Sequence, residues 1–368
     1  MFRSSGCLGS VLIRMGVGAL LFLGAVYLLW TNEGRVDFGR VAKDAVILSP
    51  ESVDTAAEGK LVAVSGKLRS DEPLGDAPYL QAGPYVALAR NVEMYAWIER
   101  RREGAKGSSG SSSGDKAPND YEYELGWTNS PQDSSNFAVP PGHENPPLTV
   151  ESTKKTVATV KIGAYALDAR SLTMPPSREL ILDDSVMMPD VKRYAEGKYL
   201  FEGDGLLAEP SVGDTRISYK VVDDGLDVTA FGQLAGNRIA PYVHRRGDTL
   251  YRAFASGPEA AIAQMDNEYR ALLWGMRFFG TLLMWISFLL AISPLTQMLN
   301  LIPLVGGLGR MAVRLLLLAL AVVLSVTIMV ISFVAHSPII LILLLLVIGG
   351  GAYWWYRQRQ PVENPIPG

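Results

Sequence analysis

Apolar residues in this chain gather into four long runs, at residues 11–30, 271–299, 315–335 and 338–356. Each run is close to the ~20 residues that an α-helix needs to cross a hydrocarbon core ~30 Å thick. The pattern predicts one transmembrane helix near the start of the chain and three near its end. A long polar stretch, residues 31–270, separates the first run from the second and predicts one large domain outside the bilayer.

Strand-like alternation marks the clearest parts of this domain. Over residues 85–100 the apolar side chains mostly share one parity, whereas Tyr95 and Trp97 take the other. A period of two is typical of a half-buried antiparallel strand. Residues 121–127 alternate again after a serine- and glycine-rich stretch within residues 104–120, which we expect to be a flexible loop. The two alternating segments therefore predict a long hairpin around that loop.

Other elements are predicted more locally. Residues 36–48 suit a short amphipathic helix, residues 60–68 a strand, and residues 217–222 and 228–234 a hairpin across an Asp-Asp-Gly turn. A helix is expected to open near Ser256 and to run into the second apolar run. Together these elements predict an α+β membrane protein with a mainly antiparallel, β-rich domain.

A weak internal echo links two of the predicted strands. Residues 62–68 and 228–234 share valine, glycine and leucine at matching positions. Two related β-modules would explain the match, and so would chance in so short a segment.

Charge is segregated along the chain and predicts its sidedness. The whole chain carries a net charge of −3, yet outside residues 31–270 nearly every charged residue is an arginine. These are Arg3, Arg14, Arg277, Arg310, Arg314, Arg357 and Arg359, against the single acid Glu363. Short loops rich in arginine stay in the cytoplasm. We therefore expect residues 1–10, 300–314 and 357–368 to be cytoplasmic and the acidic domain to be extracytoplasmic, with Arg277 snorkelling to the outer interface.

Residues for catalysis or metal binding are sparse. Cys7 is the single cysteine, and the three histidines, His143, His244 and His336, lack metal-ligand spacing. The acidic pairs Asp183–Asp184 and Asp223–Asp224 lie in predicted turns. We expect no metal, no cofactor and no catalytic residue, and an acidic domain without basic-aromatic clusters predicts no nucleic-acid partner.

Aromatic side chains are the most distinctive feature of the predicted hairpin. Tyr95, Trp97, Tyr121, Tyr123 and Trp127 lie on its two strands. They suit either a ladder that stabilises the sheet or a face that binds a partner, and the sequence leaves both interpretations open.

Motifs along most of the chain, with the one-plus-three arrangement of spans, resemble the LUMA (transmembrane protein 43) family. The first is Asn-Glu-Gly-Arg after the first span, and a second is Val-Glu-Met-Tyr-x-Trp at residues 92–97. With their flanking residues these two matches span residues 31–35 and 90–97, and further matches lie at residues 49–52, 58–62, 66–68, 127, 135–137, 142–146, 160–163, 247–250 and 274–277. The short N-terminus and the serine-glycine loop depart from the family pattern.

The resemblance implies a non-enzymatic scaffold in a membrane, one that self-associates and holds other membrane proteins. The family-signature residues that it marks for partner binding are Glu33, Gly34, Arg35, Glu93, Met94, Tyr95, Trp97, Trp127, Asn136, Phe137, His143, Asn145 and Pro146. The short loops resemble a bacterial member, with the domain in the periplasm. A eukaryotic member would place it in the lumen of the endoplasmic reticulum or nuclear envelope.

Two other functions stay open at this point. A transport or channel accessory subunit would need a polar path, which apolar spans disfavour. An enzyme acting on lipid or envelope at the outer surface would need Asp183, Asp184 and His143 or His244 to meet in one cleft.

Overall fold

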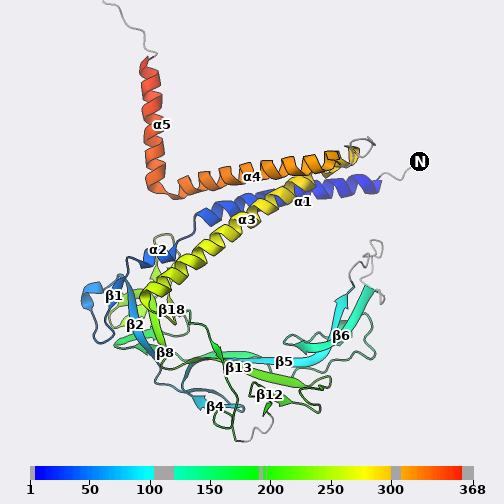
Figure 1. Ribbon diagram of the computed structural model, residues 1–368, viewed down its shortest axis with the longest axis vertical. Coiled ribbons are helices and arrows are strands. Elements are labelled where there is room, and N and C mark those ends of the chain that lie inside the picture. The colour runs from blue at the N-terminus through cyan, green and yellow to red at the C-terminus, as the bar shows by residue number, and fades with distance from the viewer. Residues whose placement is uncertain (1–4, 103–119, 190–193, 196, 300–307, 359–368) are drawn as a thin grey trace, which may run out of the picture. The chain divides into compact units, whose positions relative to one another are not determined.

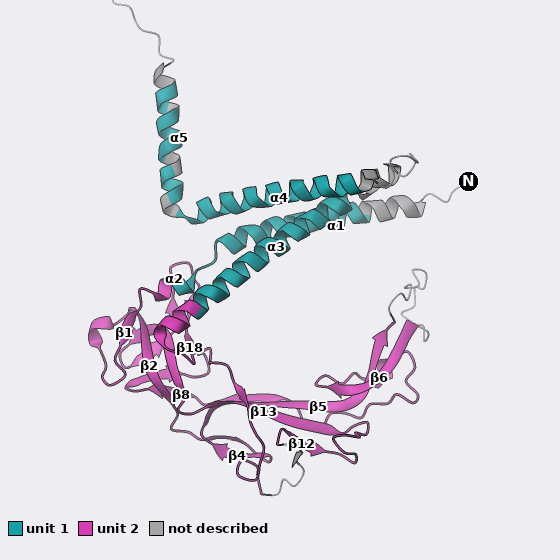
Figure 2. Ribbon diagram, viewed as in Figure 1, with its two compact units in different colours: residues 1–39, 264–368 teal, residues 40–263 magenta. Residues whose placement is uncertain are grey.

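A computed structural model describes residues 5–102, 120–189, 194–195, 197–299 and 308–358. The chain divides into two compact units, one made of residues 1–39 and 264–368 and the other of residues 40–263 (Figure 2). The first unit is helical and the second is rich in β-strands. The predicted flexible loop, residues 104–120, lies almost entirely outside the described residues.

The described residues include four long helices (Figure 1), and three of them are long and apolar enough to cross a membrane. These three are α1 (Ser5–Glu33), α3 (Pro258–Leu299) and α4 (Leu308–His336). The fourth, α5 (Pro338–Gln358), carries a shorter apolar stretch over residues 340–355. The helix predicted to open near Ser256 and continue into the second apolar run is confirmed as α3.

Close packing joins α1, α3 and α4. Their buried centre is formed by Ala25, Leu29, Met284 and Ala321. At Gly18 a Cβ atom would lie only 2.9 Å from the carbonyl oxygen of Ser287, so this glycine lets two backbones approach. Large apolar side chains on the outer surfaces of the helices remain exposed, as expected where lipid is the solvent; they include Leu20, Tyr27, Phe278, Leu316 and Val323.

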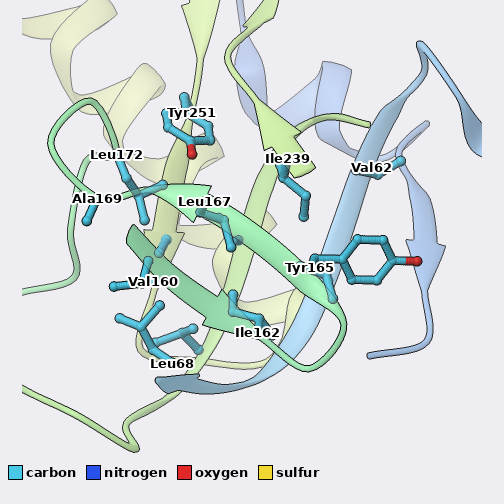
Figure 3. Close-up of a cluster of buried hydrophobic side chains, with 14 of the residues drawn as sticks. Val62, Leu68, Val160, Ile162, Tyr165, Leu167, Ala169, Leu172, Ile239 and Tyr251 are labelled. Atoms are coloured by element: carbon cyan, nitrogen blue, oxygen red, sulfur yellow. The ribbon is translucent and has the colours of Figure 1, made fainter. Parts of the chain in front are cut away.

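The first sheet of the β-rich unit is rolled up on itself. Its strands, in spatial order, are β1 (Val46–Leu48), β2 (Leu61–Arg69), β8 (Thr159–Ile162), β9 (Tyr165–Asp168), β15 (Arg238–Ala240), β14 (Asp227–Ala235) and β18 (Arg252–Phe254). Because β2 also pairs with β14, five of these strands close into a ring. Alternate side chains fill the inside, among them Leu68, Val160, Ile162, Tyr165 and Leu167 (Figure 3).

The second sheet is built on the longest strand, β5 (Tyr85–Arg101). Its other strands are β6 (Tyr121–Thr128), β7 (Thr153–Thr156), β10 (Arg178–Glu179), β11 (Tyr194–Ala195), β12 (Tyr199–Glu202) and β13 (Thr215–Asp223). Two short hairpins, β3 (Leu74–Asp76) with β4 (Leu80–Gly83) and β16 (Tyr242–Val243) with β17 (Thr249–Leu250), complete the strands. Leu88, Val92, Ile217 and Tyr219 bury one face of this sheet. The predicted hairpin is confirmed, since β5 and β6 pair from Met94–Thr128 to Arg101–Tyr121.

Two predicted elements are wrong. Residues 36–48 do not form one helix: a five-residue helix, α2 (Phe38–Ala42), is followed by β1, which runs parallel to β2 and buries Leu48. Residues 217–222 and 228–234 are strands, yet they do not pair with each other. β13 joins β5 in the second sheet and β14 joins β2 in the first, because the Asp-Asp-Gly turn carries the chain from one sheet to the other.

The internal echo falls on two strands that pair with each other about a local two-fold axis. Val64 pairs with Ala230, its own counterpart in the echo, and the antiparallel register runs symmetrically from there. The flanking hydrogen bonds repeat as well. Gly59 N–H donates to Leu234 O (2.9 Å), and Gly225 N–H donates to Leu68 O (2.7 Å).

Side chains extend the same symmetry beyond the strands. The Glu58 carboxylate accepts from Gly236 N–H (2.9 Å), and the Asp224 carboxylate accepts from Ser70 N–H (3.1 Å). Each acid precedes a glycine in the left-handed region, with φ of 74° at Gly59 and 87° at Gly225. These paired contacts favour two related β-modules over a chance match.

Candidate functional site

The ends of the membrane helices hold the first group of predicted residues. Glu33 is the last residue of α1, and its carboxylate accepts two hydrogen bonds from the guanidinium of Arg277 in α3, both at 2.7 Å. The Glu33 side chain is only 3% exposed, and the Arg277 guanidinium also lies over the ring of Trp274, 4.8 Å from its centre. A bidentate pair with both members shielded from water is a fixed joint between two helices.

Gly34 lets a third helix, α4, approach the Glu33–Arg277 pair closely. A Cβ atom at this position would lie 2.7 Å from Nε2 of His336, the last residue of α4. The His336 ring donates from Nδ1 to Ser332 O (2.8 Å), and the Ser332 hydroxyl donates to Trp30 O (2.7 Å). We call Glu33, Gly34, Arg277, Ser332 and His336 the helix-end cluster.

Neighbouring residues tie the two sequence motifs of this cluster together. Asn32 is buried and donates from Nδ2 to Leu273 O (3.1 Å). Its Oδ1 and the Nη1 of Arg35 are buried polar atoms for which the described residues offer no hydrogen-bond partner. Asn-Glu-Gly-Arg and Trp-Gly-Met-Arg, far apart in sequence, therefore meet in space. The sequence predicted that Arg277 lies near an interface but not that Glu33 neutralises it.

Aromatic rings on β5 and β6 form a second group. Tyr95 and Trp127 occupy paired positions, with ring centres 5.4 Å apart. His143 stacks on Tyr123 at 3.9 Å and meets the edge of Trp97 at 4.7 Å. One directly paired aromatic couple of the predicted ladder, Tyr95–Trp127, is present, whereas Trp97 pairs with Leu125 and Tyr123 with Glu99. A histidine from the segment after β6 packs against the rings of Trp97 and Tyr123.

That segment, residues 129–150, crosses this face of the sheet, and we call it the strap. The Asn145 amide accepts from Trp97 N–H at Oδ1 (2.7 Å) and donates from Nδ2 to Trp97 O (2.9 Å). Two residues further along β5, the Gln132 side chain makes the same two contacts. It accepts from Glu99 N–H (2.7 Å) and donates to Glu99 O (3.4 Å). Two side-chain amides thus replace a neighbouring strand along the open edge of β5, where β13 no longer covers it.

Further strap residues hold this arrangement. Phe137 is buried against Tyr123, whose hydroxyl donates to Glu99 (2.8 Å) and accepts from Val139 N–H (2.8 Å). Asn136 donates to the Asp133 carboxylate (3.1 Å), which begins the short 3-10 turn Ser134–Asn136. Hydrogen bonds from Ser135 lower the pKa of Asp133. Pro146 packs at Gly213, where a Cβ would lie 2.7 Å from Pro146 Cγ.

Arg216 of β13 is a central residue that the sequence did not single out. Its guanidinium lies between two rings, 4.5 Å from the centre of Trp127 and 4.7 Å from that of Tyr199. It also donates from Nε to Glu93 (2.8 Å), the residue paired with it across the strands. Glu93 and Trp127 are therefore held by one cation, while Met94 points into the core and is buried.

The structure thus places Trp97 and Tyr123 against the chain's own strap and Trp127 against Arg216. Leu125, on the same face, stays 39% exposed. Contacts within the chain account for the packing of Trp97, Tyr123 and Trp127, and binding of a partner by this face stays a prediction.

A buried ion cluster on the other face of β5 was also not predicted. The Asp76 carboxylate lies 2.7 Å from Arg90 Nη1, 2.6 Å from Lys155 Nζ and 2.9 Å from the Tyr219 hydroxyl. Burial acts to raise the pKa of Asp76, but hydrogen bonds from Lys155 and Tyr219 and the charge of Arg90 hold it below its ordinary value. Burial raises the pKa of Tyr219 far above its ordinary value, so its hydroxyl stays a donor.

Three of the residues named for an enzymatic alternative have separate contacts. Asp183 accepts from Ser185 N–H (2.9 Å), His143 contacts aromatic rings and Val139 O, and His244 accepts from Arg246 N–H at 3.4 Å. Among the described residues, no three histidine, cysteine or acidic side chains group as metal ligands would.

Comparison with known proteins gives a consistent result. A family model described as transmembrane protein 43 matches residues 94–338. Transmembrane protein 43 of Mus musculus and of Homo sapiens are both 28% identical to the chain, over 77% of it and 74% of their own length. A homolog from Drosophila melanogaster is 29% identical over 88% of the chain and 89% of its own. No solved structure matches the chain.

Proposed function

Because the chain belongs to the transmembrane protein 43 family of membrane proteins, we propose that it is a non-enzymatic multi-pass scaffold. In this proposal it organises other membrane proteins through its β-rich domain and associates with further copies of itself. The observation that carries the proposal is the helix-end cluster, which joins three helices through buried polar contacts at one level.

The positions of these contacts support a static bundle. Glu33 and His336 are the last residues of α1 and α4, and Arg277 meets Glu33 in the first part of the predicted second span. Deeper in the bundle the buried polar side chains of the described helices are serines, Ser287 and Ser325. A transport path needs ionisable or hydrated groups along the spans, so this arrangement favours a structural role over a transport or channel accessory subunit.

The same cluster supports the predicted sidedness. The ends of α1 and α4 and the beginning of the second span meet, so these three points share one side of the bilayer. With α5 as a fourth span, both termini are cytoplasmic and the β-rich domain is extracytoplasmic, as the arginine distribution predicts. In a bacterium the domain would lie in the periplasm, and in a eukaryote in the lumen of the endoplasmic reticulum or the nuclear envelope.

Proximity labelling tests the scaffold. A labelling enzyme inserted at residue 110 of the full chain would be compared with the same enzyme placed at the junction of a chain lacking residues 60–255. We expect the full chain to label a reproducible set of membrane proteins that the shortened chain does not. Identical sets from both chains would contradict partner binding by the domain.

Self-association and sidedness need their own measurements. Mass photometry of the full chain in native nanodiscs should show particles with more than one copy. A protease added outside sealed cells or vesicles of known orientation should cleave a tag at residue 110 and spare tags at both termini. Single copies, or the reverse cleavage pattern, would overturn the corresponding part of the proposal.

A further inference from the structure

An open groove lies on the face of the second sheet away from its core. It has a volume of about 640 Å³, within the range typical of small-ligand sites. Its lining is polar and includes Asn91, Ser152, Lys154, Tyr199, Ser218 and Lys220. We call it the lysine groove. It goes beyond the scaffold function, which does not use it.

Strand register explains how two lysines come to face each other here. Ala89 of β5 pairs with Lys154 of β7 on one side and with Lys220 of β13 on the other. Residues paired directly across strands point to the same face, and neighbouring strands lie about 4.8 Å apart. The two lysines therefore rise about 10 Å apart from the floor, with only the methyl group of Ala89 between them.

Charges around the groove are balanced except at these two positions. Glu179 pairs with Lys198 at 3.3 Å, and Glu93 pairs with Arg216 at 2.8 Å. Arg90 is directed to Asp76 on the other face. Within the described residues no carboxylate lies within ion-pair distance of Lys154 or Lys220. Glu179 is the residue paired with Lys220 across β10 and β13, but its carboxylate makes its ion pair with Lys198. Positive charge is therefore in excess in this groove, although the domain is acidic overall.

Hydrogen-bond donors complete the lining. In the next row of the sheet Asn91 pairs with Ser218. The Ser152 hydroxyl oxygen accepts from Val92 N–H (3.0 Å), which leaves its own proton to donate. Two ammonium groups with hydroxyl and amide donors in the next row suit a compact dianion, because phosphate oxygens take several donors and two positive charges at once.

We propose that the lysine groove binds a phosphate monoester, held between Nζ of Lys154 and Nζ of Lys220. The ring of Tyr199, which lines the groove, gives the organic part of the ester an apolar surface. Both a soluble metabolite and the headgroup of an anionic lipid carry this chemistry, and the experiment separates the two sources.

Binding of radiolabelled glycerol 3-phosphate to the purified full chain is the direct test. In phosphatidylcholine nanodiscs we expect saturable binding that weakens at least ~10-fold in Lys154→Gln/Lys220→Gln, since each lost ammonium removes a charge-assisted contact. The matched control is Lys67→Gln/Lys161→Gln, which removes the same charge from lysines on the first sheet that pair with Asp227 and Asp71. The control should bind like the wild type.

Competition identifies the source of the phosphate. Nanodiscs with one fifth phosphatidic acid should suppress the labelled binding if the lipid headgroup is the ligand and leave it unchanged if the ligand is soluble. A Lys154→Arg/Lys220→Arg variant, which keeps both charges, should retain binding and so separates loss of charge from loss of folding. No saturable binding, or equal weakening in both glutamine variants, would overturn the proposal.

Discussion

Asn145 holds Trp97 by both of its backbone polar groups, with the side-chain oxygen on the N–H and the side-chain nitrogen on the carbonyl. The contact replaces one residue of a missing strand at the open edge of β5. A side chain that imitates backbone in this way fixes the strap to the sheet and also blocks the edge from pairing with another chain.

Replacing Asn145 with alanine should therefore lower stability by about 1–3 kcal/mol, because the backbone of Trp97 loses both partners in a half-buried place. Urea unfolding of the detergent-solubilised chain, followed by tryptophan fluorescence, measures the loss. Asn237→Ala, at an exposed turn position, serves as the control and should change stability by less than about 0.5 kcal/mol. Equal effects of the two substitutions would show that the amide contributes nothing specific.

Glu33 and Arg277 form a testable pair in the helix-end cluster. Glu33→Gln leaves a half-buried guanidinium without its carboxylate, and we expect a loss of about 3–5 kcal/mol. Thermal unfolding in nanodiscs is the measurement, and exposed Glu259→Gln is the control. The exchanged double variant Glu33→Arg/Arg277→Glu should recover part of the loss. A double variant no better than the sum of its single changes would mean that the pair does not couple.

Stability should also depend on the charge of Asp76. Its folded-state pKa is held below 3.8, so the carboxylate stabilises the fold above that pH and the contribution disappears as the pH falls through the folded value. Asp76→Asn should be less stable than the wild type at pH 7 and show a flatter fall of stability between about pH 4 and pH 2. The midpoints of urea unfolding across this pH range test the prediction. If the midpoints of both proteins fall in parallel with pH, Asp76 does not cause the pH dependence.

Substitution by alanine should reduce stability to different extents at two glycines whose backbone is left-handed. At Gly163, with φ of 58°, a Cβ would lie within 1.9 Å of Pro50 O, whereas Gly142, with φ of 82°, has open space around it. Gly163→Ala should lower the unfolding free energy by more than about 3 kcal/mol, and Gly142→Ala by about 1 kcal/mol. Circular dichroism melting of both variants gives the comparison. Equal losses of unfolding free energy in the two variants would mean that the backbone around Pro50 can move aside at little energetic cost.

Local patterns in the sequence identified elements better than they identified partners. The alternation of residues 85–100 predicted β5, because each side chain's face follows from its position alone. The pairing of β13 and β14 was missed because a good turn between two strands does not decide which sheet each one joins. β1 was mistaken for helix because a three-residue strand has too few positions to show a period.

In the candidate sites too, the sequence identified some residues but not the residues that they contact. Glu33, His143 and Asn145 were identified by resemblance, but their roles depend on Arg277, Trp97 and Tyr123, which lie elsewhere in the sequence. Arg216 carried no local signal at all, since an arginine between polar residues on a strand is ordinary until Trp127 and Tyr199 enclose it.

The symmetric pairing of β2 and β14 has a consequence for how the domain can change during evolution. Each of the two modules has an acid followed by a glycine, Glu58–Gly59 in one and Asp224–Gly225 in the other. Both residues of each pair form hydrogen bonds with the opposite module. Such a chain resembles a fused dimer, with its dyad inside one polypeptide. The second sheet, whose strands all lie between β2 and β14 in sequence, can lengthen, shorten or acquire new ligands while the β2–β14 pairing that closes the five-strand ring stays as it is.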